Sequence, residues 1–280
     1  MKCIKCNSER VQKDGNSNGK QRYKCLDCKK SFLYGVYEGK IEYIEHFKTK
    51  IQKLDRNKLT RDNYCIPTNK ISYVLRKSLE NSMKNNNYKF PTECYKDEKT
   101  YTDEYVQKHY EDCMYNFDLN MKYFNSLDSK EFNRMLNEII EKHDLKDVVD
   151  LKEYNKVRGL YILVLDEYKQ VYVGVSDDIK HRIITHWSAK KEFDRMIFGR
   201  KENSILSIDS FGALDTTRIF VKTGLSEMKM YSSEAQIVSD VDGRYCLNRV
   251  AGGINFEKNE DYRNVMLVAT QVRRDLENNE

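Results

Sequence analysis

Two pairs of cysteines near the N-terminus constrain the fold of this chain more than any other feature. Cys3 and Cys6 are separated by two residues, and Cys25 and Cys28 repeat that spacing after eighteen intervening residues. Four thiolates in two such pairs satisfy tetrahedral zinc, and so small a domain has too little apolar area to fold without a metal. We therefore predict a structural Zn²⁺ site. The alternatives are four unrelated thiols or a redox pair.

The length and composition of the chain allow more than this small metal-binding domain. The 280 residues are enough for about two domains, and 20 tyrosines and 11 phenylalanines supply the bulk for modest cores. No apolar run approaches the roughly 20 residues of a membrane helix, and the N-terminus lacks the apolar core of a signal peptide. We expect a cytoplasmic protein without membrane association, whose eight cysteines are thiols or metal ligands.

Positive charge is concentrated in residues 1–40. This segment holds 10 Lys and Arg against 4 Asp and Glu, a net charge of +6, so the rest of the chain, 39 against 40, has −1. Such an asymmetry is typical of a module that binds a polyanion, joined to a nearly neutral body. A solvated basic surface is the alternative.

Residues 36–154 have the apolar spacing of helices. Apolar residues at three- and four-residue steps form three stripes, which predict three helices. The stripes are Ile41, Ile44, Phe47, Ile51 and Leu54; Tyr105, Val106, His109, Tyr110, Cys113 and Phe117; and Phe132, Met135, Leu136, Ile139 and Ile140. Residues 56–80 predict short helices around Pro67, and the Asn- and Lys-rich residues 81–104 predict a loop or linker. We expect a mainly helical connector.

The pattern changes near residue 155, where compact apolar runs replace the helical stripes. Residues 159–165 and 170–175 are such runs, and the polar turn between them predicts a β-hairpin. A further strand is expected at 218–221 and a helix at 226–241, before a loop at 248–253. The sequence therefore predicts a small antiparallel sheet flanked by helices.

A helix is also expected directly after the hairpin, with Ile179, Ile183 and Trp187 on one face. Ser176 or Asp177 can cap its N-terminus. The predicted fold class of the whole chain is α+β. Its expected parts are a zinc ribbon at 1–35, the helical connector at 36–154 and a C-terminal domain at 155–280.

The residues around the cysteine pairs carry a first resemblance. Residues 11–15 read VQKDG, residues 19–25 read GKQRYKC and residues 29–32 read KKSF. These segments resemble the zinc ribbon of bacterial insertion-sequence transposases, which precedes a helix-turn-helix and helps to bind the ends of the element. The resemblance implies DNA binding, and a ribbon that mediates protein contacts is the alternative. The phosphate contacts that it implies are Lys20, Arg22, Lys24, Lys29 and Lys30.

An ordered set of residues in the C-terminal region carries a second resemblance. The set comprises Gly159, Tyr161, Tyr172, Gly174, Arg182, His186, Glu234 and Asn248. Its first four members lie on the two strands of the predicted hairpin. Arg182 and His186 are four residues apart, so on a helix they share a face and can point toward one site. Over residues 157–253 this series resembles the GIY-YIG nuclease superfamily.

The resemblance implies a Mg²⁺-dependent nuclease domain with two departures from the usual pattern. Leu160 and Val173 stand where isoleucines are usual, and a proline common after the metal-binding helix is absent. Taken alone, a tyrosine on a strand is usually a core residue, and a glutamate on a helix is usually a surface residue. The position of Tyr161 and Glu234 in the ordered set favours the functional interpretation.

Hydrolysis of a phosphodiester needs an attacking water and groups that stabilise negative charge on the phosphate. Arg182 can stabilise that charge with paired donors, and Glu234 can hold one Mg²⁺ as a Lewis acid for the leaving oxygen. The resemblance implies Tyr161 as the base and Tyr172 as a partner that lines the site. A tyrosine pKa of about 10 makes a weak base at neutral pH unless a cation or a second hydroxyl favours the anion. The residues alone do not fix the order of the two tyrosines.

The other candidate residues have less defined roles. His186 is a proton-transfer group, a phosphate ligand or, beside Trp187, a buried structural histidine. Asn248 is expected to brace the site by hydrogen bonds. The remaining cysteines are expected to be buried thiols, and a second zinc site with His109 is the alternative. These cysteines are Cys65, Cys94, Cys113 and Cys246.

The sequence thus predicts a DNA endonuclease of restriction or mobile-element type, with a ribbon that binds double-stranded DNA. One carboxylate centre cuts one strand at a time, so a double-strand break would need a homodimer on the DNA or two nicks. The alternatives are a repair or structure-selective nickase and a non-catalytic DNA-binding regulator or transposition accessory protein. Residues 67–77 could open a recognition helix, but a connector with a solvated basic face is the simpler interpretation.

Overall fold

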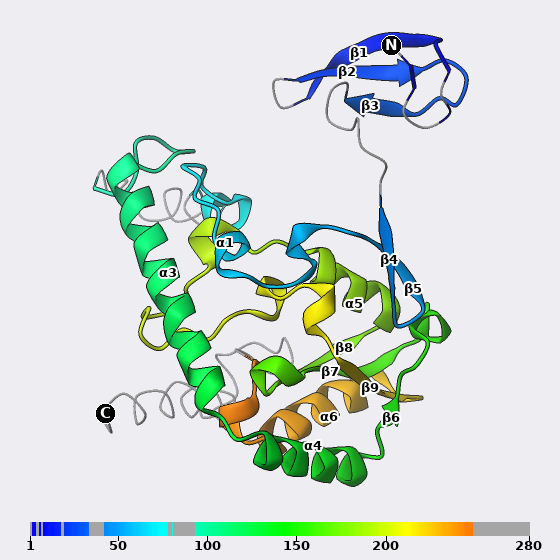
Figure 1. The fold of residues 1–280 in the computed structure, drawn as a ribbon, viewed down its shortest axis with the longest axis vertical. Coiled ribbons are helices and arrows are strands. Elements are labelled where there is room, and N and C mark those ends of the chain that lie inside the picture. Colours follow the sequence, from blue (N-terminus) through cyan, green and yellow to red (C-terminus); the bar gives the residue numbers. More distant parts are fainter. Residues whose placement is uncertain are drawn as a thin grey trace. The chain divides into compact units, whose positions relative to one another are not determined.

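Helices and small antiparallel sheets together give the chain an α+β fold (Figure 1). The computed structural model describes residues 2–3, 6, 8–17, 20–33, 42–77, 80 and 93–248. The chain divides into two compact units, Met1–Ile44 and Glu45–Glu280. Residues 81–92 of the predicted loop at 81–104 lie outside the described residues, as does the loop at 248–253 beyond Asn248.

The N-terminal unit contains a three-stranded antiparallel sheet in the order β1-β2-β3. Its strands are β1 (Val11–Ser17), β2 (Lys20–Cys25) and β3 (Ser31–Leu33). The buried hydrophobic cluster of this unit consists of Cys3, Cys25 and Phe32. Two of these three side chains are candidate metal ligands, so apolar burial alone contributes little to the stability of this sheet.

The first predicted helix, over residues 41–54, is replaced by a β-hairpin. Strands β4 (Tyr43–His46) and β5 (Thr49–Gln52) pair with each other. Phe47 and Lys48 adopt left-handed backbone angles, with φ of 45° and 52°, which reverses the chain between the strands. The Phe47 ring stacks on Trp187, and its carbonyl accepts a hydrogen bond from the Leu151 amide. These tertiary contacts override the helical spacing of the apolar residues.

A four-stranded antiparallel sheet forms the centre of the C-terminal unit, in the order β6-β9-β7-β8. The strands are β6 (Lys146–Asp147), β7 (Gly159–Leu165), β8 (Gln170–Ser176) and β9 (Arg218–Thr223). The predicted hairpin at 159–175 and the predicted strand near 218 are thereby confirmed. Every residue of β7 is buried, because both faces of this strand are covered.

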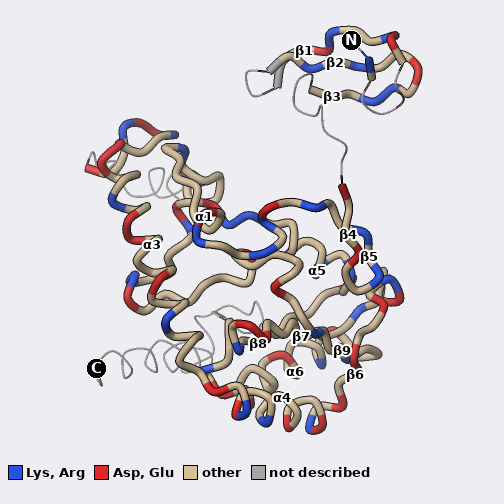
Figure 2. The backbone as a smooth tube through the Cα atoms, viewed as in Figure 1, with Lys and Arg blue, Asp and Glu red and all other residues tan. Residues whose placement is uncertain are grey.

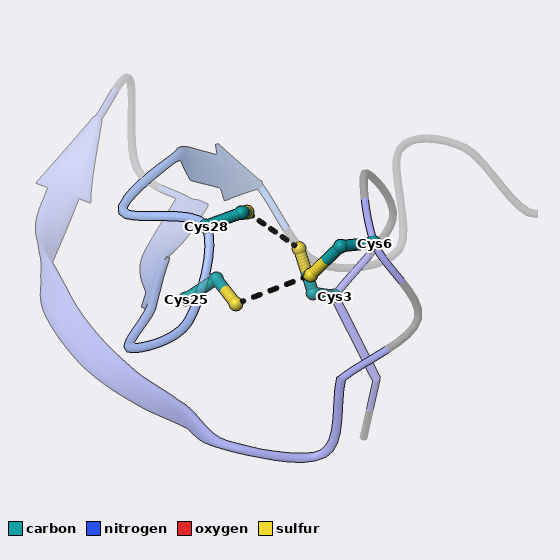
Figure 3. Close-up of side chains that lie close together, drawn as sticks. All are labelled: Cys3, Cys6, Cys25 and Cys28. Atoms are coloured by element: carbon teal, nitrogen blue, oxygen red, sulfur yellow. Dashed lines mark hydrogen bonds between the residues drawn. The ribbon is translucent and has the colours of Figure 1, made fainter.

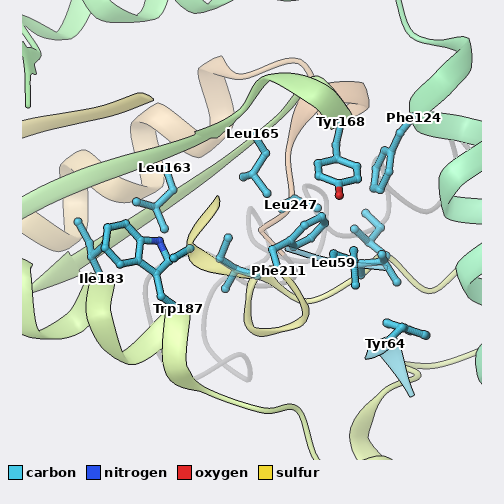
Figure 4. Close-up of a cluster of buried hydrophobic side chains, with 14 of the residues drawn as sticks. Leu59, Tyr64, Phe124, Leu163, Leu165, Tyr168, Ile183, Trp187, Phe211 and Leu247 are labelled. Atoms are coloured by element: carbon cyan, nitrogen blue, oxygen red, sulfur yellow. The ribbon is translucent and has the colours of Figure 1, made fainter. Parts of the chain in front are cut away.

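Four helices pack around this sheet (Figure 1). They are α3 (Asp103–Ser126), α4 (Ser129–His143), α5 (Ile179–Ser188) and α6 (Glu227–Asp240). On one face, Leu163 packs with Ile183 and Trp187 of α5, in a cluster that continues to Leu59 and Phe124 (Figure 4). Residues of the middle region therefore share a core with the C-terminal hairpin.

The other face of the sheet packs against α4 and α6. Leu160 and Ile162 of β7 share a buried cluster with Phe132 and Leu136 of α4 and with Ile237 of α6. Charged residues of both signs lie along α4 (Figure 2). The alternation of buried and exposed residues confirms the predicted helices at 105–117, 132–140 and 226–241.

The N-terminal cap of α5 differs from the prediction. Asp178 is the capping residue, and its carboxylate accepts a hydrogen bond from the His181 amide. Ser176 instead donates its hydroxyl to the Asp178 carbonyl and accepts from the Asp178 amide. The hairpin strand β8 extends through Ser176, and the carboxylate of Asp177 accepts a hydrogen bond from Arg158 instead of capping the helix.

Short helical turns connect the larger elements. Those before the sheet are η1 (Asp55–Asn57), α1 (Arg61–Tyr64) and η2 (Leu151–Tyr154), and η3 (Asp166–Tyr168) joins β7 to β8. After α5 come η4 (Phe193–Arg195), η5 (Ile208–Ser210), η6 (Ala213–Asp215) and η7 (Gly243–Tyr245). The short helices predicted over residues 56–80 correspond to η1 and α1 before Pro67 and to the helical residues 73–77 after it. Among the described residues, no helix has the length and apolar character needed to cross a membrane.

Candidate functional site

The four N-terminal cysteines form one cluster (Figure 3). Their sulfur atoms all lie within 4.8 Å of one another, and the Cys3–Cys28 and Cys6–Cys25 sulfur pairs are each 3.6 Å apart. With Zn–S bonds of about 2.3 Å, a tetrahedral site separates its sulfurs by about 3.8 Å. The thiols therefore fit a metal ion such as zinc in both donor type and spacing.

Local backbone hydrogen bonds hold the two cysteine pairs in this position. The Cys3 amide donates to the Ser8 carbonyl at 2.7 Å, and the Cys25 amide donates to the Lys30 carbonyl at 2.9 Å. A hydrogen bond from the Cys28 backbone lowers the pKa of the Cys25 thiol to about 6, whereas burial and the neighbouring thiols raise that of Cys6 to about 12, so Cys25 ionises first. A thiol that ionises readily is suited to bind a cation, because the thiolate is the metal-binding form.

The basic residues of the ribbon differ in their availability to a partner. Lys29 and Lys30 are exposed, and Lys24 is half-buried. Arg22 is engaged within the unit, because its Nε donates to the Asp14 carbonyl and lies 3.1 Å from the Asp14 carboxylate. The side chain of Lys20 lies outside the described residues. Lys29 and Lys30 are thus better placed than Arg22 for phosphate contacts.

Tyr161 lies in the middle of the central sheet, opposite Gly174 on β8. Its ring extends over this glycine, since a Cβ at position 174 would lie 2.4 Å from the Tyr161 hydroxyl oxygen. Gly174 therefore creates the space that the tyrosine occupies, and any larger residue would displace the ring. Tyr161 is 0% exposed, so its surroundings are set by the protein.

The hydroxyl of Tyr161 contacts His186, a residue of α5 on the same face of the sheet. The Tyr161 oxygen is 2.9 Å from His186 Nε2, and His186 Nδ1 is 2.7 Å from a carboxylate oxygen of Asp209. His186 is 3% exposed. A buried polar ring with both nitrogens engaged has a fixed orientation, which a solvent-facing histidine lacks.

Arg182 lies one turn before His186 on α5 and interacts with both tyrosines of the set. It hydrogen-bonds to Tyr161 and Tyr172, and this opposes the rise in their pKa values that burial causes. Burial still dominates, and it raises the pKa of Tyr172 to about 12 and that of Tyr161 well above its ordinary value. Arg182 is exposed and Tyr172 is partly exposed, so these two residues form the surface of the cluster.

Glu234 reaches this cluster from α6. Its side chain is buried, at 5% exposure, and its negative charge raises the pKa values of Tyr161 and Tyr172. Within the described ranges, the four N-terminal cysteines are the sole group of three or more metal-ligating side chains. Glu234 is therefore not part of a carboxylate cluster. A single carboxylate with nearby hydroxyls suits Mg²⁺, which keeps several waters and takes further oxygens from a phosphate.

Asn248 supports the strand on which Tyr172 and Gly174 lie. Its side-chain oxygen accepts from the Val173 amide at 2.9 Å, and its side-chain nitrogen donates to the Val173 carbonyl at 2.8 Å. β8 is the edge strand of its sheet, and Asn248 completes the backbone pairing of Val173 on the outer side. This contact fixes β8 beside the tyrosines.

One residue of the cluster is absent from the sequence prediction. Asp209 lies in η5 and contacts His186 from a connection that has no regular spacing relative to α5. No sequence pattern marks such a partner.

The second zinc site is also not found among the described residues. Cys65 and Cys113 are buried and interact with each other, and His109 Nε2 contacts the Phe193 carbonyl at 2.9 Å.

The structure thus brings five residues of the ordered set together from strands β7 and β8 and helices α5 and α6. They are Tyr161, Tyr172, Arg182, His186 and Glu234. Comparisons of the chain with family models, with curated proteins and with solved structures found no match.

Proposed function

We propose that the chain is a Mg²⁺-dependent DNA endonuclease of the GIY-YIG type, with a zinc-stabilised ribbon that helps to bind double-stranded DNA. The observation that carries this proposal is the assembly of two tyrosines, an arginine, a histidine and a glutamate around the Tyr161 hydroxyl. These residue types supply a base, a phosphate ligand and a metal ligand. Their common location matches the chemistry that the sequence set implies.

Arg182 is the group that would meet the scissile phosphate. It is exposed, and its guanidinium offers several donors in a planar arrangement that suits phosphate oxygens. Negative charge grows on these oxygens as water attacks, so a donor already in place stabilises the transition state more than the ground state. Tyr172, partly exposed beside Arg182, would line the same surface.

Tyr161 would take a proton from the attacking water, which enters from the side of Arg182 and Tyr172. Burial makes the tyrosinate unfavourable, so the phenolic proton needs an acceptor. His186 Nε2, at 2.9 Å, is that acceptor. The phenolic O–H bond breaks and an N–H bond forms on the ring. The tyrosinate then lies beside Arg182, takes the proton of the water and returns to a neutral phenol. The leaving oxygen takes a proton from a solvent water, and the hydroxide formed removes the extra proton from His186 by way of the Tyr161 hydroxyl.

Glu234 would hold the metal ion, together with water and phosphate oxygens. When bound there, Mg²⁺ supplies Lewis-acid stabilisation of the leaving oxygen. Glu234 is buried beside the two tyrosines, and its carboxylate is of the donor type that a divalent cation prefers. One carboxylate supports one metal and therefore one cut at a time, which predicts nicking by a monomer and double-strand cleavage by a homodimer or by two successive events.

The N-terminal cysteine cluster would hold Zn²⁺ in a structural role. All four positions of the tetrahedron are filled by thiols, which leaves no open position for a substrate. The exposed Lys29 and Lys30 of the knuckle between Cys25 and β3 would contact DNA phosphates. In this proposal the ribbon contributes affinity for DNA, and the C-terminal unit cleaves the phosphodiester bond.

Incubation of a supercoiled plasmid with the purified chain, in Mg²⁺ or in EDTA, tests this function. We expect nicked or linear product in Mg²⁺ alone. Arg182→Ala should reduce the cleavage rate about a hundredfold or more, as loss of a transition-state donor does. Lys180→Ala removes a positive charge from the same helix and serves as the matched control. Binding without cleavage by the wild type would instead indicate a non-catalytic DNA-binding regulator.

A further inference from the structure

Asp209 and His186 form a hydrogen-bonded pair behind Tyr161, and the proposed function assigns no role to the carboxylate. Asp209 Oδ1 is 2.7 Å from His186 Nδ1, and the opposite nitrogen of the ring, Nε2, is 2.9 Å from the Tyr161 hydroxyl. Two successive hydrogen-bonding contacts therefore connect the carboxylate to the imidazole and the imidazole to the phenol. The imidazole is almost fully buried, whereas 30% of the Asp209 side chain is exposed.

The exposed side of Asp209 explains how it can remain ionised next to a buried ring. It lines a pocket of about 350 Å³ together with Arg56, Lys190 and Lys191. Burial alone would raise the pKa of Asp209, but the hydrogen bond with His186 and the positive charges of Lys191 and Arg182 lower it below its ordinary value. An ionised carboxylate has no proton to donate and can only accept.

The acceptor character of Asp209 decides which tautomer His186 adopts. A neutral imidazole carries one proton, and a carboxylate at Nδ1 requires that proton on Nδ1. Nε2 then presents its lone pair to Tyr161, whose hydroxyl donates to it. The other tautomer would direct an Nε2–H toward the hydroxyl and leave no base for the phenolic proton.

We propose that Asp209 is a positioning residue, which holds His186 in the Nδ1–H tautomer so that Nε2 can take the phenolic proton of Tyr161. This assignment rests on the proposed nuclease function. It also gives a row of alternating charges after proton transfer, from Asp209 through His186 and Tyr161 to Arg182, in which each charge is beside one of opposite sign. No bond to Asp209 forms or breaks.

A second histidine–aspartate pair in the same unit provides a control. His143 Nε2 is 2.7 Å from the Asp240 carboxylate, and this pair is not in contact with any residue of the tyrosine cluster among the described contacts. The carboxylate here faces Nε2, which predicts the opposite tautomer, Nε2–H. Replacing Asp240 should therefore alter a histidine tautomer without altering the chemistry at Tyr161.

The experiment combines ¹⁵N NMR of the five histidines of the full chain with cleavage kinetics. Asp209→Asn keeps the shape of the side chain but allows an amide N–H to face Nδ1. We expect His186 to change from Nδ1–H to Nε2–H in this variant, with the single-turnover cleavage rate about a hundredfold lower and the DNA dissociation constant unchanged. The signal is assigned by its loss in His186→Gln. Asp240→Asn should change the tautomer of His143 and leave cleavage at the wild-type rate.

Two results would overturn the assignment, and a third would overturn the function on which it rests. His186 that stays Nδ1–H in both Asp209→Asn and Asp209→Ala, the second of which has no acceptor, would show that another group sets its tautomer. A changed tautomer with wild-type cleavage would remove Asp209 from the reaction. A wild-type protein that cuts no DNA would refute the nuclease proposal itself, whereas the NMR spectra would still report whether Asp209 fixes His186. A melting curve of Asp209→Asn close to that of wild type shows that the variant is folded.

Discussion

The two units of this protein are stabilised in different ways. The N-terminal unit has a buried cluster of Cys3, Cys25 and Phe32, whereas the sheet of the C-terminal unit is buried on both faces. In the first unit, we propose that folding depends on a metal ion held by the four clustered thiols. In the second, folding depends on apolar burial, and the polar groups of the tyrosine cluster are positioned by the same strands and helices that form the core.

This difference predicts that removing one thiol affects one unit only, and it gives the largest expected effect. Metal binding contributes about 10–16 kcal/mol to the folding of small zinc domains. Cys25→Ser should therefore lose the bound zinc and unfold the N-terminal sheet, while the C-terminal unit melts at the wild-type temperature. Elemental analysis and amide NMR signals of residues 20–33 measure the two effects.

Cys94→Ser is the matched control, because Cys94 lies outside the cluster. This variant should retain one zinc per chain. Zinc at the wild-type level in Cys25→Ser, or a lower melting temperature of the C-terminal unit, would contradict the separation of the two units.

In the C-terminal unit, the same residues contribute to the packed core and to the candidate site. Substitution of Gly174 tests whether stability and cleavage depend on these residues together. Ala at position 174 would place a methyl group 2.4 Å from the Tyr161 hydroxyl, so the ring must move away from His186. Overpacking of this kind costs about 1–3 kcal/mol. We expect Gly174→Ala to lose that much stability and to lose cleavage as well.

Gly159→Ala separates the loss of stability from the loss of cleavage. A Cβ there would lie 2.4 Å from the Lys222 carbonyl oxygen on the neighbouring strand, and it would leave the Tyr161 hydroxyl untouched. Chemical denaturation should give similar losses of stability for the two variants, but Gly159→Ala should still cut DNA. Equal activity of the two variants would mean that the position of Tyr161 does not matter.

The smallest effect is expected at the surface of the ribbon. Replacing Lys24, Lys29 and Lys30 by Ala should reduce the slope of log affinity against log salt by about 0.9 for each phosphate that no longer meets a lysine. Lys130→Ala with Arg134→Ala, on the exposed side of α4, is the control and should leave the slope unchanged. A slope that does not change in the ribbon variant would assign the ribbon to protein contacts.

The two units also differ in how far the sequence predicts them. The spacing of the cysteines and the two apolar runs at 159–165 and 170–175 are local patterns, and the corresponding cluster and hairpin are found. The helix expected at 41–54 is a hairpin instead. Its turn consists of Phe47 and Lys48, which carry no turn signal, and contacts with Trp187 and Leu151 stabilise it.

The candidate site is also predictable only in part, because some of its contacts are tertiary and leave no local sequence pattern. Tyr161, Arg182 and Glu234 occupy an ordered series that can be followed along the chain. Asp209 contacts His186 only because the connection after α5 returns to the sheet, and no spacing in the sequence encodes that return. The pairing of Arg22 with Asp14 is likewise a consequence of the β1–β2 register, which the basic composition of the ribbon does not reveal.

The central claim is that the C-terminal unit cuts DNA with Glu234 as its metal ligand, and Glu234→Gln tests it most directly. The change keeps the shape of the side chain and removes the charge that would attract Mg²⁺. Losing a negative charge near phosphate does not weaken DNA binding electrostatically. We therefore predict normal binding in a gel-shift assay and no cleavage of the same DNA, without rescue by moderate Mg²⁺, in a protein whose melting curve matches wild type. Glu227→Gln, at the exposed start of α6, should cut normally. Full cleavage by Glu234→Gln would contradict the account.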